Sequence, residues 1–523
     1  MRGKITWMLM TLLMVACGKD GMEADDGVDY HYGRHLAHEK IVLGKRLENP
    51  YKTANITKAL QDLYPVKSDR IDVRTTDLYV RFLPKSEAEY EVLQSLGLNL
   101  MDHPMDYEIL EEGDWYHDPE VPEGKMTWQY AVVPADFSFP DMEYEIIDEC
   151  YLAENDPGTR SGSGIDWEAV ERQAYRITGN EAMLVPETKA SKVCPSGRIT
   201  IVDEDYNEGR PIGVAGVRVA CNTFIKFSHG YTDKDGYYKM SKTFSTNPRY
   251  RLVFDNSKGF SIGFNLLIVP ASISTLGKAE PEGVNMTVTK KSESKLYKRC
   301  VVNNAAYDYY SRCEPDDLSI SQPPKDLRLW IFHALEASSA LMMHHGAVID
   351  MDLVSSFLGD YAALVKLFLP DITLGVSNDK DYRSIYATTC HELAHASHFS
   401  KVGTAYWDKY IMYVVSSFIS SFDLYGDGKG TNAGYCEVGE MWAYYLESKM
   451  CHERYGGAYH SYGSSLWFYP QILRYLDEAG IECREIFAVM DGNINSSETL
   501  KRALMGAYDD KSAAIELVFD RYR

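Results

Sequence analysis

The sequence predicts a multidomain protein with a small α+β module, an all-β sandwich and a mostly α-helical C-terminal domain. Two observations support this division. Between residues 197 and 289, short runs with strand-like alternation are separated by turns, as is typical of a β-sandwich. From residue 296 onward the chain is rich in aromatic residues and in helical periodicity, which predicts packed helices.

The first residues have the composition of a bacterial export signal. Arg2 and Lys4 precede an apolar run over residues 5–16, which is too short to cross a bilayer as a helix. The M-V-A-C tetrapeptide that ends at Cys17 resembles the lipobox of bacterial lipoproteins. This resemblance implies that residues 1–16 are a signal peptide and that Cys17 becomes the lipidated N-terminus. A secretory signal with an accidental cysteine is the alternative.

A tether follows the signal peptide. Residues 17–29 are acidic and contain glycine without an apolar period, which predicts a flexible connection. The formal net charge of −22 argues against nucleic-acid binding and against adhesion to anionic headgroups, because like charges repel. We therefore expect anchoring in the bacterial cell envelope, at the outer membrane, through acyl chains on Cys17 and not through a basic patch.

Residues 30–155 are predicted to form the α+β module. A capped amphipathic pattern predicts a helix over 55–63, and alternation predicts a strand over 77–83. A second helix over 86–96 and a second strand over 98–101 would complete a β-α-β unit. The acidic and aromatic residues of this module form no pattern that predicts catalysis, and its surplus charge is expected on a solvated face.

A linker, residues 156–196, begins with a Gly- and Ser-rich run and carries one predicted helix over 166–178, with Asp166 as its N-cap. The sandwich, residues 197–289, follows. Its predicted short strands and turns cover 198–202, 214–219, 231–238 and 250–254.

A T-D-x-D-G-x-Y turn that starts at Thr232 follows a Gly- and Val-rich strand that starts at Pro211. Together they resemble carboxypeptidase-regulatory-like, transthyretin-like domains, which implies a non-catalytic spacer or binding module. Asp233 and Asp235 are of the type that binds calcium. A hairpin turn with Gly236 at positive φ explains the same residues and is the favoured interpretation.

The strongest functional signal is the H-E-x-x-H motif from His391 to His395. On an α-helix these histidines lie one turn apart on the same face, so both imidazoles can reach one metal ion. Glu392 projects about 100° round the helix, where a base can act on a zinc-bound water. A buried helix with two hydrogen-bonded histidines is the alternative. Cys390 is interpreted as a small buried residue on another face, not a ligand.

A catalytic zinc ion takes three protein ligands, so one more ligand is needed. The candidates are His398, Glu437 and Glu440. His398 follows His395 by three residues on the same helix, which is a poor position for a tetrahedral site. The metzincin pattern fails, because Lys401 stands where its third histidine should be.

The G-E-M-W-A-Y-Y segment around Glu440 resembles the N-E-G-F-A-x-Y segment of gluzincin aminopeptidases. This resemblance, which covers two short segments of the chain, implies that Glu440 is the third Zn²⁺ ligand. Glu437 is the alternative ligand or a neighbour that supports the ligands. The spacing between His395 and Glu440 is longer than is usual in that group, which predicts an inserted helix over 406–422.

The zincin-like domain, residues 296–523, contains other predicted elements. An apolar helix is predicted over 330–344, and further helices over 465–478, 481–490 and 498–505. A strand is predicted over 372–376, shortly before the histidine helix. In zincin folds an edge strand at this place binds the substrate backbone by strand addition, and the resemblance implies the same here.

These motifs predict a membrane-anchored zinc metallopeptidase of the gluzincin type, which hydrolyses peptides or proteins with Glu392 as general base. Candidates for the oxyanion donor follow the Glu440 helix and are Tyr455, Tyr459, His460 and Tyr462. One alternative is a surface lipoprotein that binds a glycan or protein through a catalytically degenerate zincin scaffold. The other is a metal-dependent hydrolase of non-peptide amides. The intact Glu392 favours an enzyme.

Ten cysteines occur in the chain, and lipidation of one leaves an odd number, so at least one thiol is free. Cys300 could pair with Cys313, and Cys150 with Cys194, but spacing does not determine connectivity. No C-x-x-C motif occurs, which argues against a zinc ribbon and against a thioredoxin site.

Overall fold

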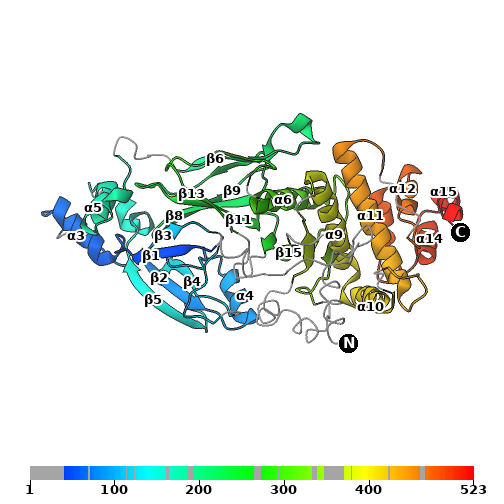
Figure 1. Cartoon of the computed structure of the whole chain (residues 1–523), viewed down its shortest axis with the longest axis horizontal. Helices are drawn as coiled ribbons and strands as arrows, with labels where there is room; N and C mark the ends of the chain where they lie inside the picture. The colour runs from blue at the N-terminus through cyan, green and yellow to red at the C-terminus, as the bar shows by residue number, and fades with distance from the viewer. Residues whose placement is uncertain are drawn as a thin grey trace, which may run out of the picture.

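Figure 1 shows the computed structural model of the chain. The predicted signal peptide, the tether and Cys17 lie outside the residues that the structure describes. No helix within the described residues is long and apolar enough to cross a membrane. The described residues are 40–68, 71–113, 115–122, 125–160, 164–186, 194–263, 273–292, 294–332, 338–346, 370–377, 380–421, 425–459 and 466–522.

The described part of the chain runs broadly along the long axis of the molecule (Figure 1). The N-terminal module, in blue and cyan, lies at one end, and green strands fill the middle. Helices coloured yellow to red lie at the other end. The protein contains both helices and several sheets, which confirms its α+β character.

The N-terminal module combines small antiparallel sheets with helices. Its larger sheet has the order β4 (Gln129–Pro134), β2 (Asp77–Leu83) and β5 (Glu143–Cys150), and β1 (Val42–Arg46) pairs with β3 (Tyr107–Glu111). Its helices are α3 (Thr53–Leu63), which precedes β2 in the sequence, and α4 (Glu87–Ser95), which follows β2. The helix α5 (Trp167–Ile177) follows the module. The predicted helices and the predicted strand over 77–83 are therefore confirmed.

Side-chain caps explain where two of these helices begin. The Ser86 side chain accepts a hydrogen bond from the backbone N–H of Glu89 at the start of α4. The Asp166 side chain accepts one from the N–H of Ala169 at the start of α5. Each cap satisfies a backbone donor that the first turn of a helix leaves unpaired.

The predicted β-α-β unit is wrong. Both partners of β2 are antiparallel to it, and residues 98–101 form only an isolated bridge between Met101 and Tyr130. Leu98 and Leu100 pack, partly buried, against the core that includes Leu93 and Val80. Partly buried leucines in an irregular segment therefore produced the strand-like pattern.

The middle of the molecule is a two-layered β-structure (Figure 1). The smaller sheet has the order β10 (Tyr237–Lys239), β6 (Ser196–Ile201), β14 (Met286–Val288), with β7 (Ile212–Gly213) paired to β6. The larger sheet begins with β9 (Lys226–Tyr231), β8 (Val217–Thr223), β11 (Arg249–Asn256) and β12 (Phe260–Gly263), and β13 (Ile273–Lys278) also pairs with β11. Buried side chains of both sheets belong to one hydrophobic cluster.

The larger sheet does not end at the predicted boundary between residues 289 and 296. It continues from β12 into β15 (Leu327–Phe332), β17 (Ile372–Gly375) and finally β16 (Ser339–Ala340). The pairs β12–β15 and β15–β17 are parallel, whereas β16 is antiparallel to β17. The predicted sandwich and the predicted catalytic region therefore share one sheet and one core, contrary to the separate units expected at 197–289 and 296–523.

The predicted helix over 330–344 is wrong, because its first residues belong to β15 and Ser339 and Ala340 form β16. The strand β15 is buried along most of its length. A continuous apolar run is typical of a central parallel strand, and periodicity cannot separate it from a buried helix.

The C-terminal part is built from helices. They are α6 (Ser294–Arg312), α9 (Tyr382–Val402), α10 (Thr404–Ser421), α11 (Ala433–Tyr455), α12 (Gln471–Glu478), α13 (Cys483–Val489), α14 (Ser497–Ala507) and α15 (Ser512–Phe519). The predicted inserted helix is confirmed as α10, and the last three predicted helices are α12, α13 and α14. The sequence reading named neither α6 nor α15.

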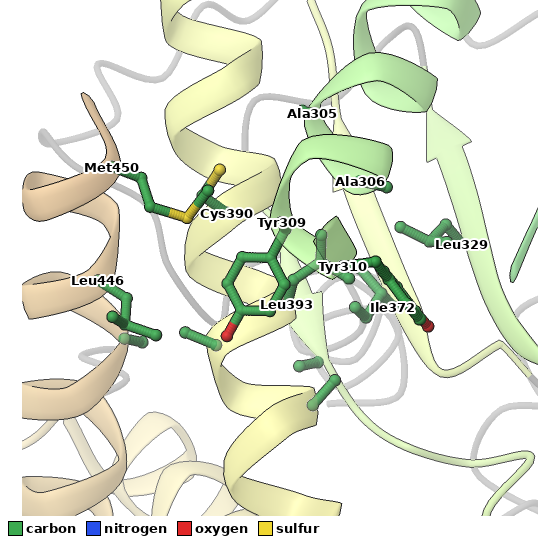
Figure 2. Packing of buried hydrophobic residues seen from close by; sticks show 14 of the residues in the cluster. Ala305, Ala306, Tyr309, Tyr310, Leu329, Ile372, Cys390, Leu393, Leu446 and Met450 are labelled. Carbon is green, nitrogen blue, oxygen red and sulfur yellow. The ribbon is translucent and has the colours of Figure 1, made fainter. Parts of the chain in front are cut away.

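Figure 2 shows α9 between α6 and α11. Tyr309 of α6 lies on one side of α9 and Leu446 and Met450 of α11 lie on the other. Cys390 and Leu393 of α9 point into the same buried cluster, so the interpretation of Cys390 as a small core residue is confirmed.

The nine cysteines within the described residues form no disulfide, so the suggested pairs Cys300–Cys313 and Cys150–Cys194 are not formed. Cys300 lies within α6 and Cys313 directly after it. At the rise of an α-helix their Cα atoms are about 20 Å apart, which is too far for a disulfide.

The acidic turn of the sandwich joins β9 of the larger sheet to β10 of the smaller sheet, so the turn is formed but the predicted hairpin is wrong. Oδ1 of Asp233 accepts hydrogen bonds from the backbone N–H groups of Asp235 and Tyr237, at 2.9 Å each. Gly236 has φ of 86°, a conformation that favours glycine. These bonds and this φ give Asp233 and Gly236 a role in the turn itself.

Candidate metal centre

The helix α9 carries the H-E-x-x-H motif in its buried middle. Asp381 caps its start by accepting a hydrogen bond from the N–H of Ser384 at 2.8 Å, and Gly403 at φ of 78° ends it. His391 and His395 lie one turn apart on the face that meets α11, and their ring centroids are 4.9 Å apart. Local helix geometry thus places both imidazoles together, as the motif predicted.

Glu440 comes from α11, which packs against α9 (Figure 2). Its Oε2 lies 3.5 Å from Nε2 of His391, and its Oε1 lies 3.5 Å from Nε2 of His395. One ligand atom from each of these three residues lies within 4.8 Å of the other two, and all three side chains are buried. The predicted triad is therefore assembled and could hold a metal ion.

The spacing of the triad fits a tetrahedral ion. Zinc bonds to nitrogen and oxygen of about 2.0–2.2 Å at tetrahedral angles separate the ligand atoms by roughly 3.3–3.6 Å. Both nitrogen–oxygen distances to Glu440 fall in this range. Little movement of the three side chains would be needed to enclose an ion.

Carboxylates around His391 favour a positive charge at this point. Burial lowers the pKa of His391, but hydrogen bonds with Glu440 and Glu447 and the charge of Glu392 outweigh burial and raise it to about 10. A bound cation would take the place of that proton. Burial lowers the pKa of His395 to about 3, so this imidazole is in the neutral form that binds metals.

Glu440 is held in its ionised form. Burial alone would raise its pKa, but the two imidazoles and a hydrogen bond from Tyr410 keep the pKa below its ordinary value. The Tyr410 hydroxyl donates to Oε1 of Glu440 at 2.6 Å, and the Tyr425 hydroxyl donates to Oε2 at 3.4 Å. The third ligand is therefore an oriented carboxylate.

Glu447, two turns beyond Glu440 on α11, binds the other side of His391. Its Oε2 lies 3.0 Å from Nδ1 of His391. A carboxylate at Nδ1 holds the proton there, so that Nε2 is directed at the metal position. The sequence reading missed Glu447, although its seven-residue spacing from Glu440 places it on the same helical face.

Glu392 lies in the same buried region as the triad. Its side chain is fully buried, and its charge contributes to the raised pKa of His391. The motif position therefore places a carboxylate beside the candidate metal ligands without making it part of the triad.

The alternative ligands do not join this group. Oε2 of Glu437 accepts a hydrogen bond from the backbone N–H of Ser497 at 2.9 Å, so this side chain faces the start of α14. Three residues along α11 offset the two glutamates by about 60° round the helix, so that Glu440 meets the histidines of α9 while Glu437 meets Ser497. The His398 ring packs against Tyr406 at a centroid distance of 5.1 Å and is a buried neighbour, as expected.

The structure describes two of the four candidates for the oxyanion donor. The Tyr455 hydroxyl donates to Oδ2 of Asp203 in the β-rich part at 3.0 Å, and Tyr455 lies about 22 Å beyond Glu440 along α11. Tyr455 is therefore not at the metal centre. The Tyr459 ring stacks on the His452 ring with centroids 4.0 Å apart and lies under the guanidinium of Arg474. Neither of these contacts is with a member of the triad. His460 and Tyr462 lie outside the described residues.

The predicted substrate strand over 372–376 is β17, but it is not an edge strand. It lies between β15 and β16, and β16 is the last strand of the sheet within the described residues. The strand β17 is kept from the edge by β16, a two-residue strand that the sequence pattern does not predict. The edge beside α9 is therefore formed by Ser339 and Ala340.

The chain was compared with protein-family models, with curated proteins and with solved structures, and nothing matched. The assignment of this centre therefore rests on its own residues and their geometry.

Proposed function

We propose that this protein is a zinc-dependent metallopeptidase in which His391, His395 and Glu440 hold the metal. The observation that carries the proposal is the buried triad with Glu392 in the same motif. Two imidazoles and one carboxylate form the ligand set of catalytic zinc sites that keep one position for water. Calcium and magnesium prefer oxygen ligands, so they fit this set less well.

A zinc ion in such a ligand set lowers the pKa of water and polarises the carbonyl that is attacked. Glu392 supplies the base: its carboxylate would accept the proton of the attacking water and deliver it to the leaving amine. Glu447 holds Nδ1 of His391, and Tyr410 holds Oε1 of Glu440, so that the ligands need little reorganisation.

The substrate would lie along the edge of the large sheet. The strand β16 is antiparallel to β17 and lies next to α9. An extended peptide that runs beside β16 would bring its carbonyl groups past the triad, and β16 would guide it without taking it up as a full added strand, because the Ala340 carbonyl already accepts the Trp407 indole. The peptidase proposal thus accounts for both the site and the sheet edge beside it.

The proposal is tested with the purified protein and the Glu392→Gln variant. Zinc is measured by elemental analysis and hydrolysis is measured with a mixture of fluorogenic peptides. We expect about one zinc ion per chain in both proteins and a turnover lower by roughly 10²–10⁴ in the variant, the usual contribution of a positioned base. A variant that hydrolyses peptides as fast as the parent protein would overturn the mechanism.

A further inference from the structure

The helix α10 lies between the two helices that carry the triad in sequence, and it contacts both of them. The Tyr410 hydroxyl donates to Oε1 of Glu440 at 2.6 Å, and the Tyr410 ring lies 5.6 Å from the His395 ring. The Tyr410 ring also packs against Gly439 of α11, where a Cβ would lie in van der Waals contact, 3.4 Å from two ring atoms. One residue of the insertion therefore touches two members of the triad.

Trp407, one turn earlier on α10, reaches the sheet. Its indole Nε1 donates to the backbone carbonyl of Ala340 in β16 at 3.1 Å. Its ring stacks on Tyr410 with centroids 4.7 Å apart and lies 5.7 Å from the His395 ring. Trp407 and Tyr410 thus form one stacked unit that links the sheet edge to Glu440.

A second tyrosine holds the other oxygen of Glu440. The Tyr425 hydroxyl lies 3.4 Å from Oε2 of Glu440 and 3.1 Å from the hydroxyl of Tyr444. The backbone carbonyl of Tyr425 accepts a hydrogen bond from the Tyr413 hydroxyl of α10 at 2.7 Å. Both oxygens of the carboxylate therefore have a tyrosine donor, and α10 contributes to the placement of each.

We propose that α10 is a positioning element of the metal centre, with Tyr410 fixing the Glu440 carboxylate and Trp407 fixing the edge strand β16. This proposal rests on the proposed peptidase function for the role of β16, but not for the role of Tyr410. A buried carboxylate with a hydroxyl donor at each oxygen is held in one orientation, so less ordering is needed when a metal binds. The inserted helix α10 then contributes to metal binding and is more than an addition to the protein surface.

The test compares Tyr410→Phe with Tyr406→Phe on the same helix. Both tyrosines are almost fully buried, but the Tyr406 hydroxyl donates to the backbone carbonyl of Ile494 and not to Glu440. Zinc affinity is measured by competition with a chromogenic chelator, which requires no catalysis. We expect Tyr410→Phe to weaken zinc binding about 10- to 100-fold, and Tyr406→Phe to leave it within about twofold of the parent protein.

Trp407→Phe tests the link to the sheet edge. It keeps an aromatic ring against Tyr410 but removes the donor to Ala340. We expect KM for a peptide to rise several-fold while zinc affinity and kcat stay near the parent values. Equal zinc affinity in Tyr410→Phe and Tyr406→Phe, whether lowered or not, would overturn the role of Tyr410. An unchanged KM in Trp407→Phe would overturn the role of Trp407.

These outcomes are separate from those of the peptidase proposal. If the parent protein binds zinc and hydrolyses no peptide, the proposed function fails, and with it the substrate role of β16. The chelator titration still decides whether Tyr410 positions Glu440.

Discussion

Nδ1 of His391 lies 3.0 Å from Oε2 of Glu447, so the first histidine of the motif is held between two carboxylates of α11. Glu440 faces its Nε2, and Glu447 faces its Nδ1. The ring orientation is therefore set by the helix packed against α9 and not by α9 alone. This relationship leads to the first prediction.

Replacing Glu447 with Ala should lower zinc affinity by about 10- to 100-fold, because His391 loses the partner that fixes its tautomer and its ring orientation. The same chelator competition measures it. Glu453→Ala is the control, since Glu453 lies on α11 but pairs with Arg312 and Lys449. An equal loss in both variants would mean that the effect is general to the helix.

The two glutamates one turn apart should behave differently. Glu440→Ala removes a ligand and should lose zinc and activity together. Glu437→Ala should keep both, because its carboxylate binds the N–H of Ser497 at the start of α14. Loss of this helix-terminal acceptor should cost about 0.5–2 kcal/mol of stability in chemical denaturation. If Glu437→Ala loses zinc and Glu440→Ala keeps it, Glu437 and not Glu440 is the zinc ligand.

Tyr455→Phe should leave kcat unchanged and lower stability. The hydroxyl donates to the buried carboxylate of Asp203, which also accepts from Arg454 at 2.9 Å. A hydrogen bond to a charged group contributes about 1.5–3 kcal/mol, and urea titration can measure its loss. A large fall in kcat with unchanged stability would return Tyr455 to the list of catalytic residues.

A fragment of residues 197–289 should not fold by itself. It would expose the edge of β12 that pairs with β15, and it would lack α6, whose buried side chains belong to the same core. Circular dichroism during heating should show no cooperative transition, in contrast to the whole chain. A sharp transition in the fragment would show that the sandwich is complete without the rest of the sheet.

Anchoring by Cys17 stays a prediction from the sequence. Cys17→Ser removes the thiol that would be lipidated, so the protein should move from the membrane fraction to the soluble fraction after an alkaline carbonate wash. If the variant remains in the washed membranes, the lipobox interpretation is wrong.

The sequence by itself determined the features that depend on local geometry. Two histidines four residues apart share a helical face wherever the helix lies, so His391 and His395 could be paired from their spacing. The cap at Asp166 and the strand over 77–83 follow equally local rules. The choice of Glu440 depended on a resemblance, and the structure places that residue beside both histidines.

Only the tertiary structure decided the features that depend on how elements pack. The rotation of α11 against α9 turns Glu440 and Glu447 toward His391 and turns Glu437 toward α14. The pairing of β12 with β15 joins segments that the sequence pattern separates, and the two-residue strand β16 takes the edge from β17. These contacts connect residues far apart in the chain, and their geometry is fixed by packing that no local periodicity encodes.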